Sequence, residues 1–280
     1  HRKMHETGLG WATHVVHHSS EQYNLAVALR QGAFQRFFAL PFYLPLAFLG
    51  LPWEVFALSS TISLLYQFWI HTRLVGRLGP LEWFLNTPSH HRVHHGRNPK
   101  YIDKNHGAIL IVWDRMFGTF QEEEEEPTYG VVKPLRSFDP LWTQVHAGVD
   151  LVRDAWRSGS LRDATRLLVE KPGWRPAALG GPIEPTEIDR ETYRPHEPSI
   201  NWATLAYALI QFLPLLVITV VLLRERHSLD PTILAGGALF VAISLGILGA
   251  LIDRRSWAWL AESTRLAAVI VTATLFAVTA

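Results

Sequence analysis

The sequence contains no cysteine among its 280 residues. Disulfides, thiolate metal sites and cysteine nucleophiles are therefore excluded within it, and any metal must be held by histidine, aspartate or glutamate. The chain also carries almost no net charge, because 26 Lys and Arg against 25 Asp and Glu leave a formal charge of +1. This balance lacks the basic field that attracts nucleic acid, so we expect no nucleic-acid partner.

Apolar residues make up 48% of the chain and gather in long runs. Residues 37–70 hold two such runs, each of about 15 residues, fewer than the roughly 20 of a full bilayer crossing. Arginines stand at both open ends of the pair, at Arg30, Arg36, Arg73 and Arg77. This charge pattern predicts a membrane hairpin that enters and leaves on the cytoplasmic side. A buried hairpin of a soluble protein is the alternative.

The C-terminal region, residues 200–280, contains three more apolar segments, at 202–223, 233–252 and roughly 266–280. The first two are long enough to span a bilayer. Arginines follow both of these segments, so charge does not settle their orientation. Prolines crowd residues 171–198 and predict a linker over 156–199. We therefore expect a catalytic domain at 1–155, the linker at 156–199 and transmembrane helices at 200–280.

Two other segments carry weaker patterns. Residues 1–33 are polar and are expected to be helical, including the good helix formers of residues 22–31. Glu122–Glu126 is an acidic run, which we interpret as a solvated loop without chemistry.

Eight of the 14 histidines fall into three motifs. HRKMH contains His1 and His5; HVVHH contains His14, His17 and His18; HRVHH contains His91, His94 and His95. On a helix, positions i, i+3 and i+4 share one face, so the imidazoles of each motif are expected to point the same way. Eight imidazoles exceed the needs of one four-coordinate metal. The motifs predict two metal ions with open positions for a small ligand.

Residue types alone do not decide which metal is bound. Two-metal hydrolases generally mix carboxylates with histidine, whereas these motifs carry almost none. Imidazoles in a membrane setting favour redox-active iron with O2, although copper and zinc also suit them and stay open. Glu6, Glu21, Asp103, Asn105 and Asp114 are candidates to orient the imidazoles. The alternatives are solvated helix charges for the two glutamates and turn or capping roles for the other three.

Six histidines lie outside the motifs. His71 ends an apolar run, where a histidine is costly unless it is paired, and is predicted to be a ligand. His106 is also predicted to be a ligand, whereas His90 is interpreted as a spare. His146, His196 and His227 belong to no spaced histidine motif and are interpreted as structural. Arg92 and Arg97 are expected to hold a loop.

The three motifs, with the apolar hairpin between the second and the third, resemble the fatty acid hydroxylase/sterol desaturase superfamily of membrane non-haem diiron enzymes. The stretches HHSSEQYNLAVALRQ, LEWFLNTPSHHRVHHGRN and YIDKNHGAILIVWDRMFGTF are most similar to its alkylglycerol monooxygenase-like branch. The resemblance covers residues 1 to about 155. Family members normally have membrane helices before the first motif, so we expect this chain to be truncated at its N-terminus.

The resemblance implies the site residues and the cofactors. The family's ligands carry over onto the eight motif histidines, His71 matches an additional ligand, and His106 stands where relatives commonly have tyrosine. Two iron ions and O2 as co-substrate follow from the family. The alkylglycerol monooxygenase-like branch implies tetrahydrobiopterin as well, although the sequence has no pterin-binding motif.

The resemblance also implies the fold and the function. We expect an all-α, integral-membrane, multi-pass helical bundle with the diiron site on its cytosolic face. The implied function is O2-dependent hydroxylation of a lipid C–H bond, with ether-lipid cleavage in the named branch. The alternatives are a hydroxylase or desaturase of sterols, fatty acids or isoprenoids, and a non-catalytic membrane metal-binding protein. The expected partners are a lipid substrate, the membrane and an unidentified electron donor.

Overall fold

The computed structural model describes residues 1–189 and 191–279, and this part of the chain is helical, with two isolated β-bridges and no strand. The predicted all-α fold class is confirmed. The chain divides into two compact units. The first unit consists of His1–Leu135 and Gln144–Pro195, and the second consists of Arg136–Thr143 and His196–Ala280.

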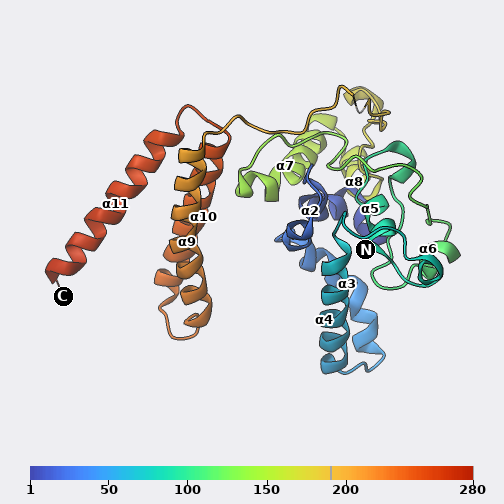
Figure 1. Cartoon of the computed structure of the whole chain (residues 1–280), viewed down its shortest axis with the longest axis horizontal. Helices are drawn as coiled ribbons and strands as arrows, with labels where there is room; N and C mark the ends of the chain where they lie inside the picture. The colour runs from blue at the N-terminus through green and yellow to red at the C-terminus, as the bar shows by residue number, and fades with distance from the viewer. Residues whose placement is uncertain (190, 280) are drawn as a thin grey trace. The chain divides into compact units, whose positions relative to one another are not determined.

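The first unit is built from short helices around one hairpin (Figure 1). Its elements are α1 (Arg2–Glu6), α2 (Gly8–His18), η1 (Leu25–Leu29), α3 (Gln35–Phe48), α4 (Trp53–Ile70), η2 (Gly79–Trp83), α5 (Pro88–His94), η3 (Pro99–Tyr101), α6 (Val112–Met116), most of α7 (Pro140–Ser158), α8 (Leu161–Val169) and η4 (Ala177–Leu179). The range predicted as a linker, 156–199, thus begins with the end of α7 and the whole of α8. Its prolines begin only at Pro172, so nothing before that residue prevents a helix.

Helices α3 and α4 form the hairpin that the sequence predicts at about 37–70, and Figure 1 shows it projecting from the unit. A short turn with Gly50 at a φ of +80° joins the two helices, and the rings of Tyr43 and Phe56 meet with centroids 5.1 Å apart. Helix α3 has no buried residue although most of its side chains are apolar. A surface of this composition needs an apolar environment outside the protein chain.

The N-terminal segment departs from the expected helix after His18. Residues 22–31 form only the 3₁₀ turn η1, and Arg30 has an extended backbone. Tertiary contacts override the helix propensity here, because the Arg30 carbonyl binds His17 and the Arg30 guanidinium binds Ser19 and the Val16 carbonyl. A continued helix would remove these contacts.

The interior of the first unit is unusually polar. Ten histidines are buried there: His5, His14, His17, His18, His71, His90, His91, His94, His95 and His106. Buried polar groups cost free energy unless each one finds a partner, so this interior needs something that binds imidazole nitrogens.

The second unit contains α9 (Trp202–Arg224), α10 (Pro231–Ile252) and α11 (Ala258–Thr279). In the described part of the chain, α9 and α10 are long and apolar enough to cross a membrane, as predicted. Helix α11 begins at Ala258, whereas the third predicted segment begins at about residue 266. Its first turns carry Glu262 and Arg265, whose charges are paired with each other, so they do not end the helix.

A glycine fixes the distance between α2 and α8. A Cβ added to Gly8 would lie 2.0 Å from the Leu167 carbonyl oxygen, whereas one added to Gly148 on α7 would meet nothing within 4 Å. We expect Gly8→Ala to lower the free energy of unfolding by about 1–3 kcal/mol, because the backbone must move to admit the methyl group. Gly148→Ala is the matched control and should be neutral or stabilising, by up to about 1 kcal/mol. Denaturant unfolding of the detergent-solubilised protein measures both, and equal effects would contradict the prediction.

Candidate metal centre

Three short helices and one helix end present the histidines. His1 precedes α1 and His5 lies on it, while α2 carries the second motif and α5, with the residue after it, carries the third. His71 ends α4. Thr7 interrupts α1 and α2 with an extended backbone and caps α2 by accepting a hydrogen bond from the Gly10 amide. Because the helix is broken at Thr7, the first motif on α1 can face the second motif on α2.

Nine histidines meet in two groups, which we call the first and the second histidine group. In each group, one nitrogen of every ring lies within 4.8 Å of one nitrogen of every other ring. The first histidine group is His1, His5, His14, His18 and His94, and the second is His17, His71, His91 and His95. The groups are adjacent, since the rings of His18 and His95 stack with centroids 4.3 Å apart.

The two H-x2-H-H motifs are each divided between the groups, contrary to the expectation that all three rings point the same way. His14 and His18 join the first group and His17 the second, whereas His91 and His95 join the second group and His94 the first. At about 100° per residue, positions i and i+4 differ by about 40°, but i+3 lies about 60° to the other side of i. One such motif can therefore serve two metal ions.

Hydrogen bonds to backbone and side-chain oxygens fix the tautomers of several rings. His1 Nδ1 donates to the His106 carbonyl (2.7 Å) and His14 Nδ1 to Gln35 Oε1 (2.9 Å). An amide or carbonyl oxygen only accepts, so each ring carries its proton on Nδ1 and a lone pair on Nε2. These two Nε2 atoms nevertheless lie 3.1 Å apart. Neither can donate to the other, so the contact is satisfied only by a cation between them.

The second histidine group repeats this arrangement. His17 Nδ1 donates to the Arg30 carbonyl (3.1 Å) and His71 Nδ1 to the Gln67 carbonyl (2.6 Å), which leaves two Nε2 lone pairs 3.3 Å apart. His91 Nε2 lies 3.0 Å from His71 Nε2. Two nitrogens that each bind a metal at about 2.1 Å lie about 3.0–3.4 Å apart at bond angles of about 90–110°. The residues present therefore fit a metal ion in each group.

Burial keeps these imidazoles neutral. Loss of hydration, aided by the neighbouring rings, lowers the pKa of His14 and of His17 to about 3, and loss of hydration lowers the pKa of His71 to about 4. Neutral imidazole is the form that binds metals, so the rings need no deprotonation at pH 7.

The groups that orient the imidazoles are mostly not the predicted ones. Carbonyls of Arg30, Gln67, Lys104 and His106 and the amide of Gln35 accept from the rings. The expected carboxylates have other partners. Glu6 pairs with Arg2 and Lys3, Asp103 pairs with Lys171, and Asp114 accepts from the backbone amides of His106 and Gly107. Asn105 bonds the His90 carbonyl and Gln121, and the role predicted for Glu21 stays a prediction. Backbone carbonyls carry no sequence signal, so these partners could not be found from residue types.

His106 and His90 lie beside the centre but outside both groups. His106 Nε2 lies 3.1 Å from the Asp103 carbonyl, and its own carbonyl accepts from His1, so it supports the first histidine group through its backbone. The metal-ligand role predicted for its imidazole stays a prediction. His90 lines a separate pocket and packs against Phe120, as expected for a spare histidine.

The acidic run and Arg92 together hold the connection that follows α4. Arg92 forms two bonds of 2.6 Å with Glu123 and donates to the Thr72 and Val75 carbonyls, so its predicted role in holding a loop is confirmed. Glu122–Glu126 is a loop with mostly exposed side chains, as interpreted, but Glu123 and Glu126 also pair with Arg92 and Arg73. The run fixes the third motif to the end of the hairpin.

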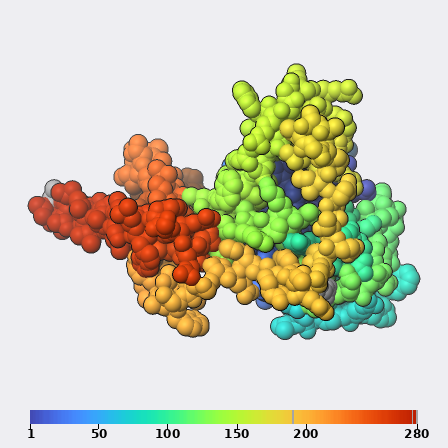
Figure 2. Space-filling view, turned by 90° about the horizontal axis from the view of Figure 1, so that it is seen from above, coloured from blue at the N-terminus to red at the C-terminus, as the bar shows by residue number. Residues whose placement is uncertain are grey.

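A cavity of about 1120 Å³ connects the centre to the surface of the first unit. Its inner wall includes His5, His18, His94 and His95, and its outer wall comes from α7, α8 and residues 172–185. Figure 2 shows blue N-terminal atoms at the bottom of a hollow between yellow-green atoms of these later residues. The hairpin contributes no lining residue, whereas several charged side chains line the cavity.

Comparison with known proteins agrees with this geometry. Residues 1–119 match the fatty acid hydroxylase family model. The alkylglycerol monooxygenase of Xenopus tropicalis is 43% identical over 267 residues, which are 95% of this chain and 59% of that protein. Those of Danio rerio and Homo sapiens are 45% and 39% identical, over 91% and 95% of this chain and 57% and 60% of their own length.

A more distant relative is an ornithine lipid hydroxylase of Rhizobium tropici, 31% identical over 121 residues, which are 43% of this chain and 37% of that protein. No solved structure matches the chain. The chain spans about three fifths of the length of the alkylglycerol monooxygenases named above. The predicted resemblance is confirmed: residues 1–119 match the fatty acid hydroxylase family model, and nearly the whole chain is similar to alkylglycerol monooxygenases.

Proposed function

We propose that this chain carries the catalytic centre of a membrane-bound diiron monooxygenase that uses O2 to hydroxylate a lipid C–H bond. The observation that carries the proposal is the pair of facing lone-pair nitrogens in each histidine group, which calls for two cations held almost entirely by imidazole. No carboxylate belongs to either group, which argues against a two-metal hydrolase. The family match and the named relatives support lipid as the substrate class.

Within this proposal the substrate is an ether lipid hydroxylated at the carbon next to the ether oxygen. Bound ferrous ions supply the two electrons that, with O2 and two protons, turn C–H into C–OH and release one water. The product is a hemiacetal, which collapses to an aldehyde and the free alcohol. An electron donor must then return two electrons before the next cycle.

The chain's own residues position these reactants. The carbonyls behind His1, His17 and His71 hold the rings so that Nε2 faces the centre. Trp11 packs against His5 and His18 and lines the same cavity, so its ring shields the first histidine group from water on that side. The cavity, which charged and apolar side chains line together, gives O2, protons and a polar head group access, while the apolar hairpin suits the lipid chain.

We also propose that the centre faces the cytoplasm. Arg30, Arg36, Arg73 and Arg77 flank both open ends of the hairpin, and basic residues of short loops favour that side. Hydroxylation of another polar lipid is the second candidate, favoured by the similarity to an ornithine lipid hydroxylase. Metal transport is disfavoured because all nine grouped histidines lie in the first unit, outside α9 and α10.

A single-turnover experiment tests the proposal without knowledge of the electron donor. The full chain is loaded with iron in lipid nanodiscs, reduced anaerobically, freed of reductant and mixed with O2 and a 1-O-alkylglycerol. We expect two iron ions per chain and about one trapped fatty aldehyde per pair of irons, because each oxygenation consumes two electrons.

The matched control is the 1-acylglycerol of equal chain length, in which the chain carbon next to the linking oxygen is a carbonyl and has no hydrogen to remove. Aldehyde from the ether lipid alone supports ether cleavage. A hydroxylated ester lipid without aldehyde would support the second candidate. A chain that contains two irons but oxidises neither lipid would contradict the oxygenase proposal.

A further inference from the structure

Two short segments of the first unit expose large apolar side chains on one surface. They are η2 with the residue after it, and α6 with the residues beside it. We call this the η2–α6 surface; its exposed residues are Leu81, Trp83, Phe84, Leu110, Trp113, Met116 and Phe117. Met116 is 69% exposed and Trp83 is 65% exposed. Seven such residues on two segments form a patch rather than scattered exposure.

Backbone pairing holds the two segments side by side. An antiparallel bridge joins Leu85 to Leu110. The Ile111 amide donates to the Phe84 carbonyl (2.9 Å), and the Asn86 amide donates to the Ile109 carbonyl (2.8 Å). Backbone pairing therefore fixes both segments, so their aromatic side chains do not belong to free loops.

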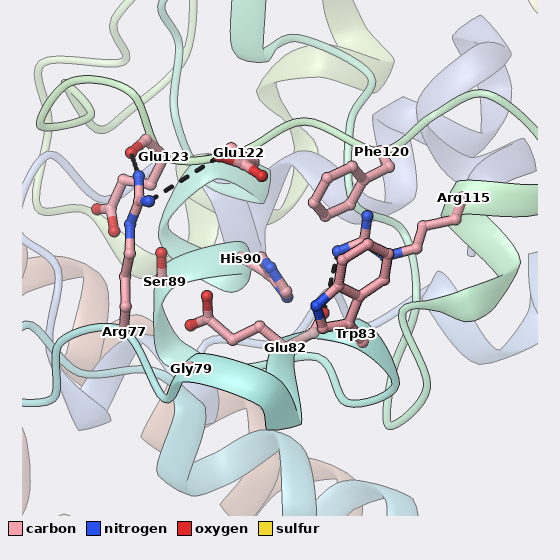
Figure 3. Close-up of a pocket in the computed structure, with 10 residues that line it drawn as sticks. All are labelled: Arg77, Gly79, Glu82, Trp83, Ser89, His90, Arg115, Phe120, Glu122 and Glu123. Atoms are coloured by element: carbon pink, nitrogen blue, oxygen red, sulfur yellow. Dashed lines mark hydrogen bonds and ion pairs between the residues drawn. The ribbon is translucent and has the colours of Figure 1, made fainter.

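Arg115 of α6 packs against η2 and stabilises the arrangement of the two segments. The Arg115 guanidinium lies 3.6 Å from the Phe120 ring centroid and 5.0 Å from that of Trp83, and it donates to the Glu82 carbonyl (3.1 Å). Figure 3 shows these rings and Arg115 on one wall of a pocket of about 190 Å³ that His90 also lines. Stacking on a cation fixes the orientation of Trp83.

The η2–α6 surface continues from the end of the hairpin. Tyr66, in the last turns of α4, donates to the carbonyl of Asn86, the residue that pairs with Ile109. Leu74, in the connection from α4 to η2, is 95% exposed. In Figure 1, α6 lies at the level of the upper end of the hairpin, where α3 and α4 join the rest of the unit.

We propose that the η2–α6 surface lies in the head-group region of the membrane and makes the first unit rest on the bilayer beside the hairpin. Its Trp and Phe side chains, backed by an arginine, match the composition of membrane–water interfaces. The seven exposed residues that define the surface are all large, whereas helix–helix contacts in membranes favour small residues. Residue 86 leads directly into α5, so contact with lipid fixes the height of the third histidine motif above the bilayer.

The absence of cysteine permits a direct test of this location. Single cysteines replace Met116 and Phe117 in the full chain, are labelled with the fluorophore NBD and are reconstituted into phosphatidylcholine vesicles. Two quenchers are compared, a lipid with a doxyl group near its head group and aqueous iodide. Val217→Cys on α9 is the lipid reference, and Val152→Cys on α7, 70% exposed in the first unit, is the water reference.

We expect doxyl-lipid quenching at Met116→Cys and Phe117→Cys to equal or exceed that at Val217→Cys. Iodide quenching should be at least about threefold weaker than at Val152→Cys, as for a side chain in the interface. Quenching by iodide alone would show a surface in water and overturn the proposal. Quenching by neither would show coverage by protein and overturn it as well. The readout needs neither metal nor turnover, so it is independent of the proposed function.

Discussion

His91→Ala is expected to lower the iron content from about two ions per chain to about one and to abolish detectable lipid oxidation. The second histidine group has only four members, and the Nε2 atom of His91 lies 3.0 Å from that of His71. Loss of a group that merely orients a ligand already weakens metal binding by about 10–100-fold, so the loss of a ligand itself should exceed that range. Metal analysis and single-turnover aldehyde yield measure the two effects.

The neighbouring residue provides a closely matched control. His90 and His91 are each 2% exposed and share α5, so alanine leaves a similar cavity at either position. Only His91 belongs to a histidine group. His90→Ala should therefore retain two irons even if it unfolds at a lower temperature. Equal iron loss in both variants would show that the loss comes from damaged packing, and it would refute the assignment of His91.

Much of the candidate site could be predicted from the sequence because helical spacing is a local property. The motifs identify eight of the nine grouped histidines, and the position of His71 at the end of an apolar run identifies the ninth. The rule that positions i, i+3 and i+4 lie on one helix face could not predict how the histidines of one motif divide between the two groups. That division depends on where α2 and α5 place their i+3 rings, which only tertiary packing decides. The same limit explains Gln35, whose partner His14 lies 21 residues away.

The fold shows the same contrast between local and distant information. Apolar length is a local signal, and it predicts α9 and α10. The start of α11 is missed because Glu262 and Arg265 look unfavourable in an apolar helix when they are considered alone. Their compensation comes partly from α9, more than 50 residues away, and is invisible to a local pattern.

Arg265→Leu should therefore destabilise the second unit by about 3–5 kcal/mol, because it leaves the Glu262 carboxylate buried without its counter-charge. Glu262 is 1% exposed, and Arg265 donates to it through Nε (2.7 Å) and to Gln211 through Nη2 (2.7 Å). Tyr207 donates to the same carboxylate. Unfolding in detergent with increasing denaturant measures the change. Arg224→Leu, at a side chain that is 83% exposed, is the control and should stay within about 0.5 kcal/mol.

The double variant Glu262→Leu/Arg265→Leu separates two explanations of such a loss. If the penalty comes from an uncompensated charge, removing both charges should restore most of the stability, because a buried ion pair contributes little net stability over apolar residues. If the penalty comes from lost packing of the arginine stem, the double variant should be at least as unstable as the single one. Tyr207 and Gln211 would lose partners in the double variant, so recovery should stop short by about 1–3 kcal/mol. Recovery to that level would identify the pair as a contact that selects how α9 and α11 associate, since apolar side chains alone would hold the helices together without fixing their register.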